Sequence, residues 1–439
     1  MLIKRNGTAI AVIMVLVLLL FGVVGCGKDQ APTENGNETQ VSEDKKGEGE
    51  QEAKVEPIKI AHAAVLSGGL ASLGEGGNRA LNIWAEQLND SGGLLGRPVE
   101  IINYDSQANP SKAVENVKKA VLEDSVDFII TTDSSGVVMG ITPLGNDLKI
   151  PIIHATGGAD NFQNVVTRYV FRVSDTATVF SYAAAKYLSE NYPEVETWAG
   201  INPDYEWGHS AWESFQKQMK KFNPNVRFVT ELWPGFGEKD FKPYITQLQA
   251  SDAEGLFTSL WSGDEITLIK QGEMVKLFDK FDVFMDGSST NFEVAFALED
   301  QMVETVGNAY YYFEGSDPTG ANEKFVKLWK EKHGENDVPN SSAGSTYSAA
   351  QVLAEAVIKA GTTEALPVIE ALEGLEITTI MGKLFVREYD HQGIREKLPM
   401  GEAMPDSRYP FWTWGKYSEI AIPQDLMPES DYKGWEANQ

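Results

Sequence analysis

The sequence is short of the residues that bind metals and cross-link chains. Its 439 residues include one cysteine, so no disulfide can form within the chain. The five histidines are scattered, and no Cys/His spacing resembles a structural zinc site or an H-E-x-x-H helix. These shortages disfavour the common metal-site classes, and we expect the protein to need neither a metal ion nor a cofactor.

Basic residues are also scarce. Lysine and arginine total 37 against 64 aspartates and glutamates, which gives a net charge of −27. A chain this acidic repels a phosphate backbone, so nucleic-acid binding is disfavoured. Hydrophobic residues make up 42% of the chain and charged residues 23%, which is the balance of a soluble globular protein. The length favours two compact lobes over one.

Long apolar runs are missing apart from one, Ala9–Val24, which follows Lys4 and Arg5. A short basic segment, an apolar core and small residues before a cleavage point are typical of a secretory signal peptide. The alternative is an uncleaved membrane helix, but the run is shorter than the ~20 residues that span a bilayer comfortably. We therefore expect residues 1–25 to be removed and the mature chain to work outside the cytoplasm.

The lone cysteine comes directly after that run. Val23-Val24-Gly25-Cys26 resembles a bacterial lipobox, in which the chain is cut before the cysteine and the thiol is acylated. The resemblance implies lipidation of Cys26 and anchoring to the outer face of the cell membrane, rather than a buried or free thiol. Residues 26–56 contain almost no large apolar residue. We expect them to form a disordered tether that reaches roughly 30 Å, or simply a solubilising tail.

From Pro57 onward, short apolar runs alternate with amphipathic ones. This alternation predicts parallel sheets whose two faces are covered by helices. A first set of strands is expected at 58–67, 99–106, 126–133 and 150–156, with helices at 77–90 and from Asn109 and Ser134. The pattern then restarts, with strands expected at 197–204, 226–233, 255–261 and 283–289. We infer an α/β protein of two lobes with a cleft between them.

Ligands of open parallel sheets sit beyond the carboxyl ends of the strands, where helix N-termini present free N–H groups. We therefore expect a small solute to bind among the loops that follow the strands. The candidate loops are 66–69, 133–136, 156–159, 203–208, 261–264 and 287–291.

Three stretches carry a resemblance to a known family: residues 58–117, GFGEKDFKPYITQL at 235–248 and TTIMGKLFVREYDHQG at 378–393. From about Pro57 to about Trp414 the chain resembles the type I substrate-binding proteins of bacterial ABC importers, in the leucine/isoleucine/valine-binding group. The resemblance implies the type I periplasmic-binding-protein fold, with two Rossmann-like lobes joined by three crossings. We place these crossings near Ser174, Phe313 and Met381. Lobe 1 would then comprise 57–174 and 314–380, and lobe 2 would comprise 175–313 and 381–430.

The resemblance also implies contacts in lobe 1. The family's serine after the third strand, which receives the ligand carboxylate, matches Ser134, with Ser135 beside it. A helix N-terminus and a hydroxyl both supply donors for a carboxylate, although the two serines could simply cap their helix. The family's alanine and threonine after the fourth strand match Thr156 and Gly158. Gly157 and Gly158 therefore let the backbone approach a ligand closely.

Further expected contacts depart from the family pattern. Two family tyrosines match Trp207 and Trp261, whose indoles could sandwich a flat or cationic ligand, unless one of them belongs to the core. The family's glutamate that pairs with the ligand ammonium matches Ser288, and Asp286 could substitute for it. Leu73 and Ser342 stand where the family has a tyrosine and a phenylalanine. An aromatic acid or an amide therefore fits the pattern as well as an amino acid does.

Two other classes of function remain as alternatives. An enzyme is disfavoured, because Trp212 replaces the second glycine in the G-x-S-x-G-like segment 208–212. The glycine-rich segment 68–77 lacks the lysine of a P-loop and the spacing of a dinucleotide-binding turn. A ligand-sensing receptor component is the second alternative. We expect a monomeric solute-binding subunit that delivers a small solute to an ABC permease by lobe closure.

Overall fold

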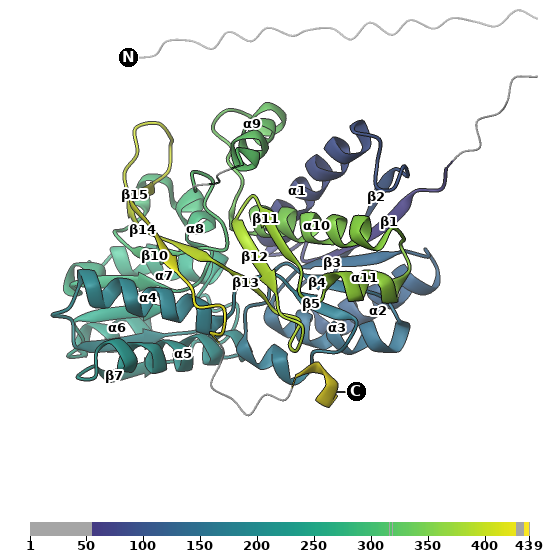
Figure 1. Cartoon of the computed structure of the whole chain (residues 1–439). Coiled ribbons are helices and arrows are strands. Elements are labelled where there is room, and N and C mark those ends of the chain that lie inside the picture. The colour runs from purple at the N-terminus through teal and green to yellow at the C-terminus, as the bar shows by residue number, and fades with distance from the viewer. Residues whose placement is uncertain (1–54, 316, 318, 427–433, 439) are drawn as a thin grey trace, which may run out of the picture. The chain divides into compact units, whose positions relative to one another are not determined.

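The computed structural model describes residues 55–315, 317, 319–426 and 434–438 (Figure 1). The predicted signal peptide, Cys26 and nearly all of the predicted tether lie outside these residues. In the part of the chain that is described, no helix is both long enough and apolar enough for a membrane crossing.

A five-stranded parallel sheet, in the order β2-β1-β3-β4-β5, forms the centre of lobe 1. Its strands are β1 (Ile58–Ala64), β2 (Val99–Asp105), β3 (Phe128–Thr132), β4 (Ile152–His154) and β5 (Val170–Arg172). Every residue of β3, β4 and β5 is buried, as expected for strands that are covered on both faces.

Six helices and a 3-10 turn belong to this lobe. They are α1 (Ala71–Asp90), α2 (Pro110–Leu122), α3 (Ser135–Leu148), η1 (Asp160–Asn164), α9 (Ala321–His333), α10 (Ser341–Ala360) and α11 (Ala365–Leu372). Helix α1 begins six residues before the predicted start at Gly77. A Cβ at Gly74 would lie 2.1 Å from the carbonyl oxygen of Val65, so glycine is required there for close packing rather than for a turn.

Lobe 2 is built on a seven-stranded sheet in the order β15-β14-β10-β9-β8-β6-β7. The parallel strands are β6 (Thr197–Ile201), β7 (Arg227–Leu232), β8 (Gly255–Thr258), β9 (Val283–Asp286) and β10 (Val306–Asn308). An antiparallel hairpin, β14 (Lys397–Met404) and β15 (Thr413–Ala421), extends the sheet beyond β10.

One helix of lobe 2, α4 (Ala177–Asn191), precedes its first strand, and the others come after parallel strands. These are α5 (Glu206–Phe222), α6 (Lys242–Ala250), α7 (Ser262–Glu273), η2 (Phe278–Lys280), α8 (Asn291–Leu298) and η3 (Glu299–Gln301). A last 3-10 turn, η4 (Trp435–Asn438), lies against lobe 1, where the indole N–H of Trp435 donates to the carbonyl of Glu388 at 2.9 Å.

A third, small antiparallel sheet changes one predicted boundary. Its strands β11 (Glu376–Thr379), β12 (Gly382–Val386) and β13 (Gly393–Arg395) pair with one another, and Figure 1 shows them between the two larger sheets. The chain enters the seven-stranded sheet only at Lys397. The third crossing therefore lies between Arg395 and Lys397, not near Met381. The other two crossings, at 173–176 and 309–320, include the predicted positions Ser174 and Phe313.

A buried ion pair joins all three crossings. Arg395 Nη2, at the third crossing, donates to Asp175 Oδ2 of the first crossing and to the carbonyl of Ala309 in the second, the latter at 3.4 Å. Both side chains are almost inaccessible, with exposed fractions of 2% and 1%. This contact connects the three crossings to one another.

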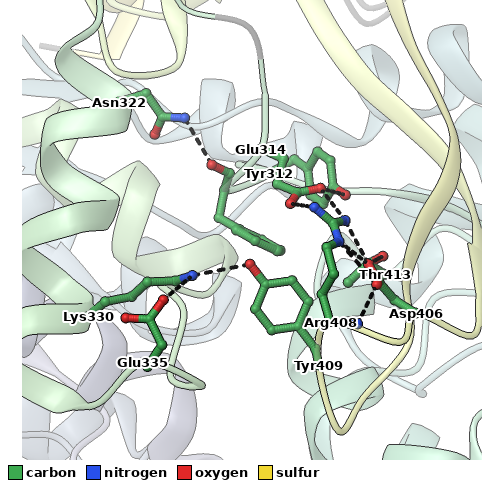
Figure 2. Close-up of polar contacts among 10 residues, drawn as sticks. Tyr312, Glu314, Asn322, Lys330, Glu335, Asp406, Arg408, Tyr409 and Thr413 are labelled. Atoms are coloured by element: carbon green, nitrogen blue, oxygen red, sulfur yellow. Dashed lines mark hydrogen bonds and ion pairs between the residues drawn. The ribbon is translucent and has the colours of Figure 1, made fainter.

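A second set of contacts at the surface joins the β14–β15 hairpin to lobe 1 (Figure 2). Arg408, in the hairpin loop, pairs with Asp406 and with Glu314 of the second crossing, each at 2.6 Å. Lys330 of α9 donates to the hydroxyl of Tyr409 at 3.2 Å. The Arg408 side chain is 58% exposed, so water screens these pairs far more than the Arg395 pair.

Candidate functional site

A cavity lies between the lobes, beyond the carboxyl ends of strands from both large sheets. Of the predicted ligand contacts and family-matched positions, all except Asp286 and Ser342 line it. The lining residues are Leu73, Asp133, Ser134, Ser135, Thr156, Gly157, Gly158, Tyr205, Trp207, Trp261, Ser288, Ser289, Thr290 and Tyr310.

The N-terminus of α3 forms one wall. Ser134 precedes the helix in an extended conformation, and its hydroxyl makes no capping bond to the helix. The hydroxyl of Ser135 accepts from the backbone N–H of Ala159 at 3.3 Å. Because the first N–H groups of a helix have no acceptor within it, this wall offers backbone donors and the Ser134 hydroxyl to an anionic or polar group.

The loop after β4 forms the adjoining wall. The Thr156 hydroxyl accepts from the backbone N–H of Asp133 and donates to its carbonyl, both at 2.8 Å, so it joins β3 to β4. Gly157 has a φ of +84°, a conformation that other residues rarely adopt. Arg172 Nη1 holds this loop from behind, donating to the carbonyls of Gly157 at 2.9 Å and Ala159 at 2.7 Å.

Aromatic side chains supply much of the opposite wall. The indole N–H of Trp207 donates to the carbonyl of Ser259 at 3.0 Å. The indole N–H of Trp261 donates to the hydroxyl of Tyr205 at 2.8 Å. Both tryptophans are therefore anchored in lobe 2 and also line the cavity. Each one belongs to the buried core and at the same time forms part of the candidate site.

Asp286, the last residue of β9, lies behind the cavity wall rather than in it. Its Oδ1 accepts from the backbone N–H of Ser288 at 2.8 Å, and the hydroxyls of Ser288 and Thr290 are 3.1 Å apart. The expected direct substitution of Asp286 for the family's glutamate is therefore wrong. Strand alternation turns this carboxylate into the interior, where it orients the serine that does line the cavity.

Two more buried carboxyls lie beside Asp286. Burial raises the pKa of Glu265 well above its ordinary value, and the charge of Asp286 raises it further. Burial also raises the pKa of Glu293 to about 7. We call Asp286, Glu265 and Glu293 the acidic cluster. It lies behind Ser288 in the lobe 2 wall.

Comparison with known proteins matches residues 57–402 to the periplasmic binding protein family model. The chain belongs to this family. A Leu/Ile/Val-binding protein homolog 4 of Brucella melitensis is 27% identical over 362 residues, which cover 79% of this chain and 84% of the relative. A leucine-, isoleucine-, valine-, threonine- and alanine-binding protein of Pseudomonas aeruginosa is 24% identical over 333 residues, which cover 74% and 85%.

Solved structures of similar fold agree with the type I binding-protein architecture predicted from the sequence. A solute-binding protein of an ABC transporter from Rhodopseudomonas palustris, in complex with 3,4-dihydroxybenzoic acid, has a TM-score of 0.75 and 17% identity, covering 85% of this chain and 98% of that one. A leucine-binding protein from Thermotoga maritima has a TM-score of 0.72 and 17% identity, covering 84% and 100%. The predicted fold is therefore confirmed.

In this binding protein the two lobes touch around the cavity. The Ser262 hydroxyl of lobe 2 donates to the carbonyl of Gly69 at 3.4 Å. The Ser341 hydroxyl, at the start of α10, donates to the carbonyl of Ser289 at 2.7 Å. Ser342, which stands at the family's phenylalanine position, does not line the cavity; its backbone N–H donates to Glu293 Oε1 at 3.4 Å. The lobes are thus in a closed arrangement.

Five residues that line the cavity of this binding protein were not predicted: Asp133, Tyr205, Ser289, Thr290 and Tyr310. The first four lie in loops that were predicted to contact the ligand because they follow strands. The sequence therefore indicated the right loops but not which side chains in them line the cavity. Tyr310 lies in the second crossing, two residues after β10, a strand that the sequence pattern did not predict. Burial raises the pKa of Asp133 to about 7, against the opposing hydrogen bonds from Ser106 and Ser134.

The hydrolase-like segment does not form a catalytic arrangement. The Ser210 hydroxyl accepts from the backbone N–H of Asp160 at 2.8 Å, a contact between the lobes. His209 bonds to Asp204 at 2.9 Å at the exposed surface. Within the described residues, no group of three His, Cys, Asp or Glu side chains is arranged to hold a metal ion.

Proposed function

We propose that the protein is the extracytoplasmic solute-binding subunit of an ABC importer and takes up an amino acid or a related small carboxylate. The cavity enclosed between two hinged lobes, with helix N–H donors on one wall, is the observation that carries this proposal. The names of the Brucella and Pseudomonas relatives point to the same class of solute. An aromatic acid is the second candidate, favoured by Trp207 and Trp261 in the cavity wall and by the benzoate-type neighbour.

The mechanism follows from the position of the cavity. A solute that binds one lobe gains contacts from the other only when the lobes close, so binding shifts the population toward the closed state. The three crossings, held by Arg395, let the lobes rotate as bodies. A membrane permease would then distinguish the loaded, closed form from the empty, open one.

A solute panel tests this function. The full-length chain, extracted in detergent, is heated with amino acids, amides and aromatic acids, and we expect at least one class to raise its melting temperature. At a hundred times its dissociation constant a solute should add about 2.7 kcal/mol of stability. A partner permease reconstituted with the protein should then hydrolyse ATP faster only when that solute is present. If neither the protein nor any solute changes the rate of ATP hydrolysis by the permease, the proposal is contradicted.

We also propose that residues 1–25 are a lipoprotein signal, that residues 26–56 are a tether, and that the mature protein acts as a monomer anchored through Cys26. Cells grown with a labelled fatty acid should incorporate the label into the wild-type chain and not into the Cys26→Ser variant. No other cysteine of the chain could carry the label, because Cys26 is its one cysteine. Mass spectrometry of the wild type should show that it begins at residue 26. Label retained in the variant, or a wild-type chain that begins at Met1, would refute the anchor.

A further inference from the structure

Four aromatic side chains line the cavity: Trp207 and Trp261, with Tyr205 and Tyr310 beside them. Both indole N–H groups are already bonded to acceptors of lobe 2, namely the Ser259 carbonyl and the Tyr205 hydroxyl. The tryptophans therefore offer a solute ring surface rather than a hydrogen-bond donor. The faces of aromatic rings attract positive charge, most strongly when water is excluded.

The lining of the cavity admits a positively charged group. None of the residues that line it is a lysine or an arginine, and Asp133 is the carboxyl among them. Arg172 lies behind Gly157 in lobe 1, on the side of the cavity formed by the loop after β4. The cavity thus combines an aromatic side in lobe 2 with a side that has backbone donors and a buried cation.

A primary ammonium carries three N–H donors, and each of them needs an acceptor once water is excluded. Asp133, the carboxyl that lines the cavity, already accepts from the Ser106 hydroxyl and from the Ser134 N–H, so part of its acceptor capacity is used. A fully alkylated ammonium has no N–H to satisfy, so aromatic surfaces suffice for it.

On the basis of the proposed solute-binding function, we propose that the cavity recognises a small solute with an alkylated ammonium group, of the betaine or choline class. The ammonium would lie against Trp207 and Trp261, and the polar end of the solute would face the N-terminus of α3. A carboxylate at that end would be favoured by the helix N–H groups and by Arg172; a hydroxyl would be favoured by Asp133.

Neutral isosteres provide the test. Glycine betaine and 3,3-dimethylbutanoate differ only in a central nitrogen or carbon, as do choline and 3,3-dimethylbutan-1-ol. Calorimetry on the full-length chain should show the charged member of at least one pair binding about 10- to 30-fold more tightly than its isostere. Equal affinity within both pairs, or no binding of either charged member, would overturn the inference.

Leucine and 4-hydroxybenzoate separate this inference from the function on which it depends. If either binds while the alkylated ammonium solutes do not, the inference fails and the importer function stands. If permease activity responds to no solute and not to the protein, the function itself fails.

Variants show which side chains cause the preference for the charged solute over its neutral isostere. Trp261→Leu should reduce the ratio of charged to neutral affinity toward one, whereas Trp261→Phe should keep part of it because the ring remains. A ratio unchanged in Trp261→Leu would contradict the aromatic assignment.

Discussion

Replacing Arg395 with methionine should lower the free energy of unfolding by about 3–5 kcal/mol, because it leaves the Asp175 carboxylate buried without its partner. The guanidinium also donates to the Ala309 carbonyl, so the variant loses a contact to each of the other two crossings. Urea denaturation followed by circular dichroism would measure the change. We also expect solute affinity to fall, because the crossings would no longer hold one geometry.

The pH dependence of this loss identifies its cause. Burial raises the pKa of Asp175, and Arg395 opposes that rise. A raised folded-state pKa gives a contribution to stability that is present at low pH and is lost as the pH rises through that pKa. Without Arg395 the pKa of Asp175 rises further, so the deficit of the variant should be smaller at pH 5 than at pH 8.

Arg408→Met is the matched control, since it removes the same side chain from exposed pairs with Asp406 and Glu314 (Figure 2). This variant should lower the free energy of unfolding by at most about 1 kcal/mol. Adding Asp175→Leu to Arg395→Met should restore most of the lost stability, because an apolar pair leaves no buried charge. If Arg395→Met and Arg408→Met lower the free energy of unfolding by the same amount, then the buried ion pair between the crossings does not stabilise the fold more than an exposed pair does.

Much of the architecture could be predicted because, in parallel α/β sheets, the alternation of apolar and amphipathic segments along the chain corresponds directly to the alternation of strands and helices. Strands such as Phe128–Thr132 are buried throughout and begin with an apolar run, and the helices between them show one apolar face. The carboxyl ends of such strands meet at one edge of each sheet, which is why the loops that hold Ser134, Gly158 and Trp261 could be named from the order of the strands; the choice of these residues came from the family resemblance.

The remaining features depend on contacts between residues far apart in the chain. Strand β12 pairs with β11 and β13 pairs with β12, and none of the three joins the lobe 2 sheet, so the third crossing could not be located from a local pattern. Tyr310 enters the cavity from a crossing, and its position depends on how two lobes pack. The apolar pattern places Asp286 correctly at a strand end, but whether its side chain faces the cavity depends on the register of β9 with β8.

Gly158→Val should weaken solute binding by more than about 100-fold while the lobes remain folded. A Cβ at this position would lie 2.9 Å from the backbone carbonyl oxygen of Asp175, 3.0 Å from the Trp207 ring and 3.2 Å from the Tyr310 hydroxyl. A valine side chain therefore either fills the cavity or stops the lobes from closing, and a loss of about 2.7 kcal/mol in binding corresponds to 100-fold. Calorimetry with the tightest solute of the panel would measure it.

The matched control is Gly136→Ala, at the first turn of α3 but outside the residues that line the cavity. Its Cβ would meet only the Glu206 carboxylate, at an ordinary 3.7 Å, so affinity should stay within about twofold. Over-packing at Gly158 should itself cost about 1–3 kcal/mol of stability, and thermal unfolding of the variant separates that cost from lost binding. If Gly158→Val folds and binds the solute as tightly as the wild type does, then the solute does not occupy this cavity, because no arrangement of the closed lobes could hold both.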